Sequence, residues 1–232
     1  ADHRFNVSRE ERRHGDRLAR EAGATTHMVL LSAFAALLHR LTGQDRLIVG
    51  TPVANRTHPA TEAMLGFFVN TLPLAVRVDG ASSFRALLAG VRDDALAAQA
   101  HQDVPLQAIV EAVNPPRQPG RNPLFQVSFV WQNTPQPVLE LPGLQVDAVP
   151  AHSGAAKVDL ALEMEETESG IAASVEYRSA LFAAGSIERM AREFRALIAS
   201  VAAAPDARVR DLEILSDDDR EQLIRQSTGT AP

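Results

Sequence analysis

The 232-residue sequence contains no cysteine, and only one tryptophan and one tyrosine. The absence of cysteine excludes disulfide bonds, thiolate catalysis and cysteine-ligated metal. No hydrophobic run is as long as a membrane span, and no signal peptide opens the chain. These absences favour a cytoplasmic location. The formal net charge of −6 argues against nucleic acid or an anionic membrane as the main partner.

The composition that remains is typical of a globular protein, with 45% hydrophobic and 22% charged residues. The length suffices for one large domain or two small ones with a sizeable core. The chain does not start with methionine, and residues 1–7 show no clear structural pattern. We therefore expect it to be a piece of a longer protein.

Hydrophobic periodicity predicts five helices and several strands. The helices are expected over residues 8–22, 25–43, from Ser82 onward, 105–113 and 187–201, and capping residues mark several of their starts. Alternating patterns predict strands over 46–50, 125–132, 157–164 and 171–177, the last two as a hairpin. A proline-rich excursion over 134–154 has one more strand expected near 144–149. The order of elements predicts an α/β layered domain with a mixed β-sheet and helices packed on it.

The segment 65–77 is the most informative of these patterns. Its apolar residues alternate so that both faces of a strand would be mostly apolar, which predicts a strand buried on both sides in the middle of the sheet. Asn70 interrupts this apolar run. A buried amide must be hydrogen-bonded, so Asn70 either is a satisfied residue of the sheet or faces a polar cavity.

Four short segments carry a stronger signal when taken in order. They are Gly50-Thr51-Pro52-Val53-Ala54-Asn55-Arg56, then Gly66-Phe67-Phe68-Val69-Asn70-Thr71-Leu72, then His101-Gln102-Asp103-Val104-Pro105-Leu106, then Arg121-Asn122-Pro123-Leu124-Phe125-Gln126. Together they resemble the C-terminal half of a condensation domain from a nonribosomal peptide synthetase. The tail resembles the linker into a following adenylation domain. We therefore divide the chain into a lobe over residues 1–205 and a linker over 206–232.

The resemblance implies one lobe of a fold like chloramphenicol acetyltransferase, in which two similar lobes form a V around a tunnel. It implies peptide-bond formation, with an acceptor amine attacking a donor thioester. The substrates arrive on the 4'-phosphopantetheine arms of carrier proteins, and no cofactor binds directly. The implied partners are the N-terminal lobe, the donor and acceptor carrier proteins and the adjacent adenylation domain.

The family's catalytic signature, His-His-x-x-x-Asp-Gly, belongs to the N-terminal lobe. No two of the seven histidines here are adjacent, so the signature is not in these 232 residues. We predict no catalytic residue in this chain and no condensation by the chain alone. The resemblance gives Arg56 the role of pairing with the aspartate of that signature, since a guanidinium can hold a carboxylate with two hydrogen bonds. The alternative is a solvated loop arginine.

Several residues are expected to form the tunnel floor or the contact between lobes: Arg56, Asn55, Asn70, Thr71, Ser128 and Gln132. Others are expected to serve structure: Gly66, His101, Asp103, Pro105, Arg121, Asn122 and Pro123. His101 more plausibly orients the helix that starts near Pro105 than performs chemistry, because no second ligand or oriented partner accompanies it. Asp103 favours the N-terminal dipole of that helix. No metal site is expected.

Two other functions stay open. A sibling domain for epimerisation, heterocyclisation or ester formation shares the fold and differs mainly in the N-terminal lobe. A non-catalytic lobe that docks a carrier protein is the second alternative. Carrier proteins are acidic, and the first helix supplies basic charge that could meet them, although a solvated helix face explains these arginines equally well: Arg9, Arg12, Arg13, Arg17 and Arg20.

Overall fold

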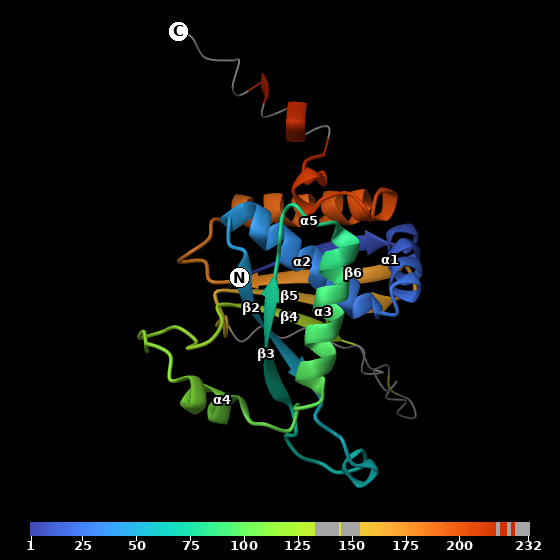
Figure 1. Ribbon diagram of the computed structural model, residues 1–232. Helices are drawn as coiled ribbons and strands as arrows, with labels where there is room; N and C mark the ends of the chain where they lie inside the picture. The colour runs from blue at the N-terminus through green and yellow to red at the C-terminus, as the bar shows by residue number, and fades with distance from the viewer. Residues whose placement is uncertain (133–143, 145–153, 217–218, 222–223, 226–232) are drawn as a thin grey trace.

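The computed structural model describes residues 1–132, 144, 154–216, 219–221 and 224–225. Its centre is a six-stranded sheet with the order β1-β6-β5-β4-β2-β3 (Figure 1). The strands are β1 Asp2–Ser8, β2 Arg46–Val53, β3 Asn70–Arg77, β4 Val127–Gln132, β5 Leu160–Thr167 and β6 Gly170–Tyr177. Strand β4 runs parallel to β2 and to β5, and the other pairs are antiparallel. The predicted α/β fold with a mixed sheet is thus confirmed.

Four helices cover one face of this sheet (Figure 1), namely α1 Arg9–Glu21, α2 Thr26–Thr42, α3 Phe84–Gln99 and α5 Ala184–Ala203. Helix α4, Leu106–Val113, lies apart from them beside β3. Two short 3₁₀ helices, η1 Pro59–Thr61 and η2 Val209–Asp211, complete the described elements. The core between the four helices and the sheet contains four fully buried phenylalanines: Phe34, Phe84, Phe129 and Phe194.

Local capping explains where the first two helices begin and end. Ser8 accepts a hydrogen bond from the backbone of Glu11 while the Glu11 carboxylate accepts one from Ser8, which is the predicted capping box. Thr25 caps α2, and Gly43 ends it with a φ of 70°, a conformation that glycine adopts at little cost. The third helix is capped by Ser83 rather than the predicted Ser82.

Strand β1 corrects the interpretation of residues 1–7 as patternless. It pairs along its whole length with β6, from Asp2 opposite Glu176 to Ser8 opposite Gly170. Only Val7 of this strand is buried, because β1 is an edge strand with one face in solvent. The alternation is therefore too weak to be recognised in the sequence. Residues 1–7 form a strand because they pair with β6, and this pairing cannot be predicted from residues 1–7 alone.

Strand β3 corrects the prediction of a central strand over 65–77. It starts at Asn70 and forms the opposite edge of the sheet. Leu72, Leu74 and Val76 are buried against the helices. The apolar residues before Asn70 lie in a loop, where Leu65 is 102% and Phe67 91% exposed. The apolar run reflects one buried face followed by an exposed loop tip, not two buried faces.

The described residues cover the second face of the sheet only in part. A separate apolar cluster of Phe125, Val158 and Ala161 lies on it, with Leu106 of α4 and Leu124 packed against it. Beyond this cluster, cross-strand rows of mostly polar residues follow one another from β4 to β1. The sheet therefore has one face for the core and one polar face that the described residues leave open.

The segment after α5 returns to the main core. Val209 and Leu212 are 0% and 2% exposed, and backbone hydrogen bonds join Val209 to Ser82 and Phe84 to Ala207. The Arg40 side chain donates to the carbonyl oxygens of Val209 and Leu212 at 3.2 and 2.8 Å. This part of the predicted linker is thus an integral part of the folded body.

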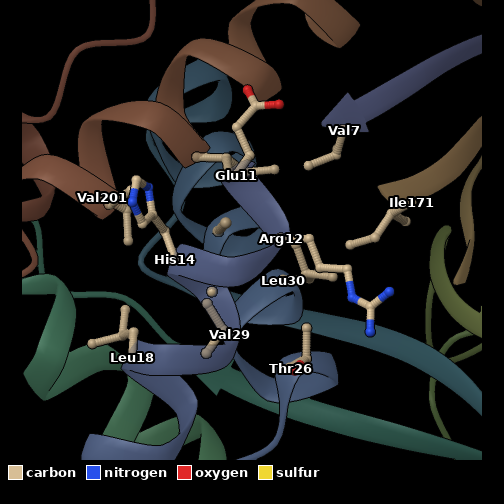
Figure 2. A pocket seen from close by; sticks show the side chains of 14 residues that line it. Val7, Glu11, Arg12, His14, Leu18, Thr26, Val29, Leu30, Ile171 and Val201 are labelled. Atoms are coloured by element: carbon tan, nitrogen blue, oxygen red, sulfur yellow. The ribbon is translucent and has the colours of Figure 1, made fainter. Parts of the chain in front are cut away.

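A small apolar cavity lies beneath α1, with α2, α5, β1 and β6 around it (Figure 2). Its volume of about 20 Å³ leaves room for about one water molecule. Glu11, Arg12 and His14 contribute to its wall, and Gly15 borders it. The cavity is a packing defect between helices rather than a site for a substrate.

The proline-rich excursion over 134–154, with the strand expected near 144–149, lies almost wholly outside the described residues. Among the helices that are described, none is by itself long and apolar enough to cross a membrane. The consecutive pair α1 and α2 passes that test only when joined, and the two are bent by 104°.

Candidate functional site

Arg56 lies in the loop after β2, and its guanidinium holds that loop together. It stacks over the Phe68 ring, with 4.4 Å between Cζ and the ring centre. It also donates hydrogen bonds to the carbonyl oxygens of Thr61 and Met64, the latter at 3.1 Å. Asn55 beside it has a φ of 52°, the left-handed region that asparagine tolerates better than most residues. In this chain Arg56 therefore organises residues 57–68.

Asn70 joins strand β3 to the start of helix α4. Its Nδ2 donates to the carbonyl oxygens of Gln102 and Val104 at 2.9 and 2.7 Å. Its Oδ1 accepts from the backbone N–H of Leu106 at 3.3 Å. Of the two interpretations of Asn70, the hydrogen-bonded residue of the fold is the one that the structure supports.

The start of α4 shows how Asn70 takes over a capping role. Pro105 is the N-cap residue and provides no side-chain hydrogen bond to the helix. His101 and Asp103, from which we expected orientation of this helix, are exposed in the turn before it. The N–H of Leu106 is instead satisfied by Asn70, which lies 36 positions earlier in the sequence.

Thr71, Ser128 and Gln132 lie on the open face of the sheet. Thr71 is paired with Pro52, and Ser128 is paired with Gly50 on one side and Ala161 on the other. Gln132 is paired with Glu165 at the end of β4. Phe129, on the other face of β4, is fully buried, as the alternation predicted. The six predicted wall residues are therefore divided between the β2–β3 edge and the open face.

Asn122 shapes the loop that leads into β4. Its Oδ1 accepts from the backbone N–H groups of Leu124 and Phe125 at 3.0 and 3.3 Å, and Gln126 donates to its carbonyl oxygen at 3.0 Å. Such an asparagine turn fixes the loop without regular secondary structure. Pro123 lies inside this turn, which supports the structural role predicted for the segment.

Asp159 is a residue that sequence reasoning missed. It is 7% exposed and lies between two arginines, 3.2 Å from Arg178 and 3.8 Å from Arg121. Arg178 also donates to the carbonyl oxygen of Gly120 at 2.8 Å. These contacts tie the predicted structural residue Arg121 and its loop to the start of β5. An acid between the apolar residues Val158 and Leu160 was the signal available in the sequence.

Gly66 and Gly50 have different roles, although both belong to the quoted segments. A Cβ atom on Gly66 would lie 3.1 Å from the Phe68 ring in an exposed loop. A Cβ atom on Gly50 would lie 2.6 Å from Cζ of the Phe125 ring, in the apolar cluster of the open face. Gly50 is therefore required for packing, which its sequence pattern did not reveal.

Among the histidines that the structure describes, His27 packs against the core. The ring of His27 at the start of α2 packs on Phe129 with 5.3 Å between ring centres, and burial lowers its pKa to about 4. It is neutral near pH 7 and faces the helical side of the sheet. Within the described residues no group of three or more His, Asp or Glu side chains could hold a metal ion.

The fold and site define a class: an α/β lobe with helices on one face, a polar open face on the other, and a loop-bearing edge. Comparison identifies the family. Residues 2–224 match the condensation-domain family, and the chain belongs to it. It is 44% identical over 214 residues to malpinin synthetase of Mortierella alpina, a match that covers 92% of this chain but 3% of that protein.

Two solved structures give the same result. The holo form of AB3403, a four-domain nonribosomal peptide synthetase bound to AMP and glycine, superposes with a TM-score of 0.86 and 27% identity, covering 94% of this chain and 18% of that one. The X-domain from teicoplanin biosynthesis, in complex with OxyB, superposes with a TM-score of 0.83 and 25% identity. That match covers 94% of this chain and 49% of the X-domain chain. This chain is thus about half as long as the X-domain chain that it matches.

Proposed function

We propose that the chain forms the C-terminal half of a condensation domain of a nonribosomal peptide synthetase. In this role it provides one wall of the tunnel where an acceptor aminoacyl thioester attacks a donor acyl or peptidyl thioester. The observation that supports this most directly is the family match over residues 2–224, together with the half-length superposition on a longer chain of the same fold.

The chemistry needs two substrates held in one orientation. The acceptor nitrogen attacks the donor carbonyl, the new C–N bond forms, the C–S bond breaks, and the proton released by the amine goes to the departing sulfur. We propose that the substrates reach the tunnel on the phosphopantetheine of carrier proteins and that the protein works in the cytoplasm. Residues beyond 205 lead toward an adenylation domain, and their first part is packed on the body through Val209 and Leu212.

The candidate wall residues shape the wall and do not take part in the reaction themselves. Arg56 and Asn55 shape the loop at the β2–β3 edge, and Asn70 fixes the start of α4. Thr71, Ser128 and Gln132 place polar groups on the open face. The histidine pair of the family signature is not among the 232 residues, so we propose that this chain alone does not catalyse condensation.

A reconstitution assay tests the proposal. The native synthetase containing these residues, and the 232-residue chain alone, are each mixed with donor and acceptor carrier proteins loaded with aminoacyl groups. We expect dipeptide from the synthetase and none from the isolated chain, measured by mass spectrometry of the released product. Robust turnover by the isolated chain would refute the dependence on a second lobe. No peptide from the synthetase, with loaded carriers confirmed, would refute condensation.

A second candidate is a non-catalytic docking lobe. The structurally similar X-domain was solved in complex with OxyB, so a protein of this fold binds another protein. In this chain Arg13, Arg17 and Arg20 lie exposed along one side of α1. Titration of the isolated chain with an acidic carrier protein, compared with the R13E/R17E variant, separates binding from catalysis. Binding without peptide formation by the native synthetase would favour this candidate.

A further inference from the structure

Two arginines lie opposite each other on β2 and β3, the strands that form one end of the sheet (Figure 1). Arg46, the first residue of β2, is paired directly with Arg77, the last residue of β3. Their neighbours Leu47 and Val76 belong to the main core, so both arginine side chains lie on the open face, where they are exposed. Directly opposed side chains have Cβ atoms about 4.5–5.5 Å apart, and like charges at this spacing destabilise a sheet.

No acidic group among the described residues compensates these two charges. Neither guanidinium has a hydrogen bond or an ion pair within that part of the chain. The acids nearest in the sequence make contacts elsewhere. Asp45 Oδ1 lies 3.3 Å from Nδ1 of His39, and Asp79 Oδ2 accepts a hydrogen bond from the Ser82 hydroxyl at 2.7 Å. The repulsion between the arginines is therefore a cost that an external carboxylate would remove.

An apolar row adjoins the arginine pair. Ile48 and Ala75 are paired in the next row of the same face, and both are exposed, Ile48 to 41%. Successive rows on one face are two residues apart, which is about 6.6 Å at about 3.3 Å per residue. An extended peptide has the same distance between residues i and i+2 on one side. A segment with an acidic residue and, two positions later, an apolar residue would therefore match both rows at once.

We propose that this surface, formed by Arg46, Arg77, Ile48 and Ala75, docks an acidic segment of the same synthetase that lies outside the 232 residues. The inference rests on the proposed function, because that function places the chain in a multidomain polypeptide, whose other parts are held near it at high effective concentration. The carboxylate accepts hydrogen bonds from both guanidinium groups, and the apolar side chain covers Ile48. A small anion would engage the arginines alone and leave Ile48 exposed, which favours a peptide segment.

Chemical modification of arginine tests the proposal in the intact protein. Phenylglyoxal reacts with accessible guanidinium groups, and mass spectrometry after proteolysis reports the rate at each arginine. We expect Arg46 and Arg77 to react about fivefold more slowly in the native synthetase than in the 232-residue chain. Arg117, which is exposed and has no ion pair among the described residues, is the control and should react equally in both. Equal rates at Arg46 and Arg77 in the two proteins would overturn the inference.

Salt shows whether the occupant is acidic. Raising NaCl from about 0.1 M to about 1 M shortens the Debye length from about 10 Å to about 3 Å, which screens exposed charge pairs. We expect most of the protection of the two arginines to be lost over this range. Protection that persists at the higher salt concentration would show that a contact independent of charge covers the surface, and it would overturn the acidic segment.

A defined probe tests the spacing. Acetyl-Glu-Ala-Leu-amide is titrated into the ¹⁵N-labelled chain and followed by NMR, beside acetyl-Gln-Ala-Leu-amide and inorganic phosphate. We expect the glutamate peptide to shift the amide signals of residues 46–48 and 75–77, the R46Q/R77Q variant to lose these shifts and R117Q to keep them. Equal shifts from the glutamine peptide would refute the role of charge. Equal shifts from phosphate would show that the arginines bind any oxyanion and would refute the docking surface.

The variant Arg77→Glu tests the premise of uncompensated repulsion. A glutamate opposite Arg46 replaces repulsion by attraction, so we expect the midpoint of thermal unfolding to rise by about 1–3 °C. Arg117→Glu, which faces no arginine across a strand pair, should give no such rise. An unchanged or lower midpoint in R77E would show that the two arginines do not repel each other and would remove the basis of the inference.

The modification experiment also separates this inference from the proposed function, because it does not depend on peptide formation. A synthetase that forms peptide while both arginines react as fast as in the isolated chain would refute the docking surface and leave the function standing. A synthetase that forms no peptide from loaded carriers but protects both arginines in a salt-dependent manner would refute the function and leave the surface standing.

Discussion

The phenyl ring of Phe125 lies directly against the backbone of Gly50, so that a Cβ atom at position 50 would be only 2.6 Å from its Cζ atom. The contact closes the apolar cluster on the open face and lets the loop before β4 rest on β2. We therefore expect Gly50→Ala to displace Phe125 and to lower the free energy of unfolding by about 1–3 kcal/mol, the usual cost of overpacking. Urea denaturation measures this change.

Glycines that face open space provide the matched control. Gly15 in α1 and Gly90 in α3 both lie inside helices, and no neighbouring atom lies within 4 Å of the place that an alanine Cβ would take. We expect Gly15→Ala and Gly90→Ala each to raise the free energy of unfolding by about 0.5–1 kcal/mol, because alanine favours the helix. A destabilised G15A would contradict the open space beside Gly15.

The contact between Gly50 and Phe125 also shows what the sequence alone does not predict. The caps at Ser8, Thr25 and Gly43 depend on neighbours within a few positions, so the starts and ends of α1 and α2 could be predicted. Gly50 and Phe125 are 75 positions apart, and no local pattern reports that a ring lies on the glycine. Local signals therefore predicted most of the elements, and the contacts between distant elements had to come from the structure.

Some features of the candidate site could likewise be predicted from local patterns, and others could not. The order of short segments predicted the family, and the alternation in β4 predicted that Ser128 and Gln132 share a face. The interpretation of residues 65–69 as strand was wrong because an exposed apolar loop and a buried strand have the same composition. Asp159 was not predicted as a site residue, because its ion pairs with Arg121 and Arg178 join parts of the chain that are distant in the sequence.

Asn70 provides the next prediction, since its amide makes three hydrogen bonds around the start of α4. We expect Asn70→Leu to leave the Gln102 and Val104 carbonyls and the Leu106 N–H without that partner, and to lower the free energy of unfolding by about 2 kcal/mol. Amide exchange should accelerate across residues 106–113 more than in α2. Hydrogen exchange followed by mass spectrometry measures both regions in one sample.

His101→Ala is the control for that experiment, because His101 is exposed in the same turn. A surface substitution of this kind changes the free energy of unfolding by about 0.5 kcal/mol or less. If H101A accelerates exchange in α4 as much as N70L does, the turn rather than Asn70 fixes the helix.

The segment after α5 carries a prediction about the domain boundary. Val209 is fully buried in the main core, and its backbone N–H donates to the Ser82 carbonyl at 2.9 Å. We expect Val209→Ala to cost about 1–3 kcal/mol through lost burial and the remaining cavity. A chain ending at residue 205 should lose more, because Leu212 is removed as well. Thermal unfolding of chains ending at 205 and at 216 tests this, and equal midpoints would place the boundary at 205.

His27 gives a prediction for acid pH, and its sign follows from the direction of the pKa shift. Burial against Phe129 lowers its pKa from 6.5 to about 4, so between these values the unfolded chain binds more protons at this position than the folded chain. The contribution of neutral His27 to the free energy of unfolding is therefore fully present above about pH 6.5, and it is lost as the pH falls toward 4. The lost free energy amounts to about 3.5 kcal/mol at most, since the shift from 6.5 to about 4 corresponds to about 1.4 kcal/mol per pKa unit.

The variant His27→Phe removes this proton linkage while keeping a ring beside Phe129. Between pH 7 and pH 4 we expect the free energy of unfolding of H27F to fall less steeply than that of the wild type, with the difference growing as the pH falls. Because all other titrating groups are common to both chains, the difference isolates His27. The titration of its ring signals by NMR reports the pKa directly. A midpoint near 6.5 in the folded protein would contradict the burial argument, whatever the denaturation curves show.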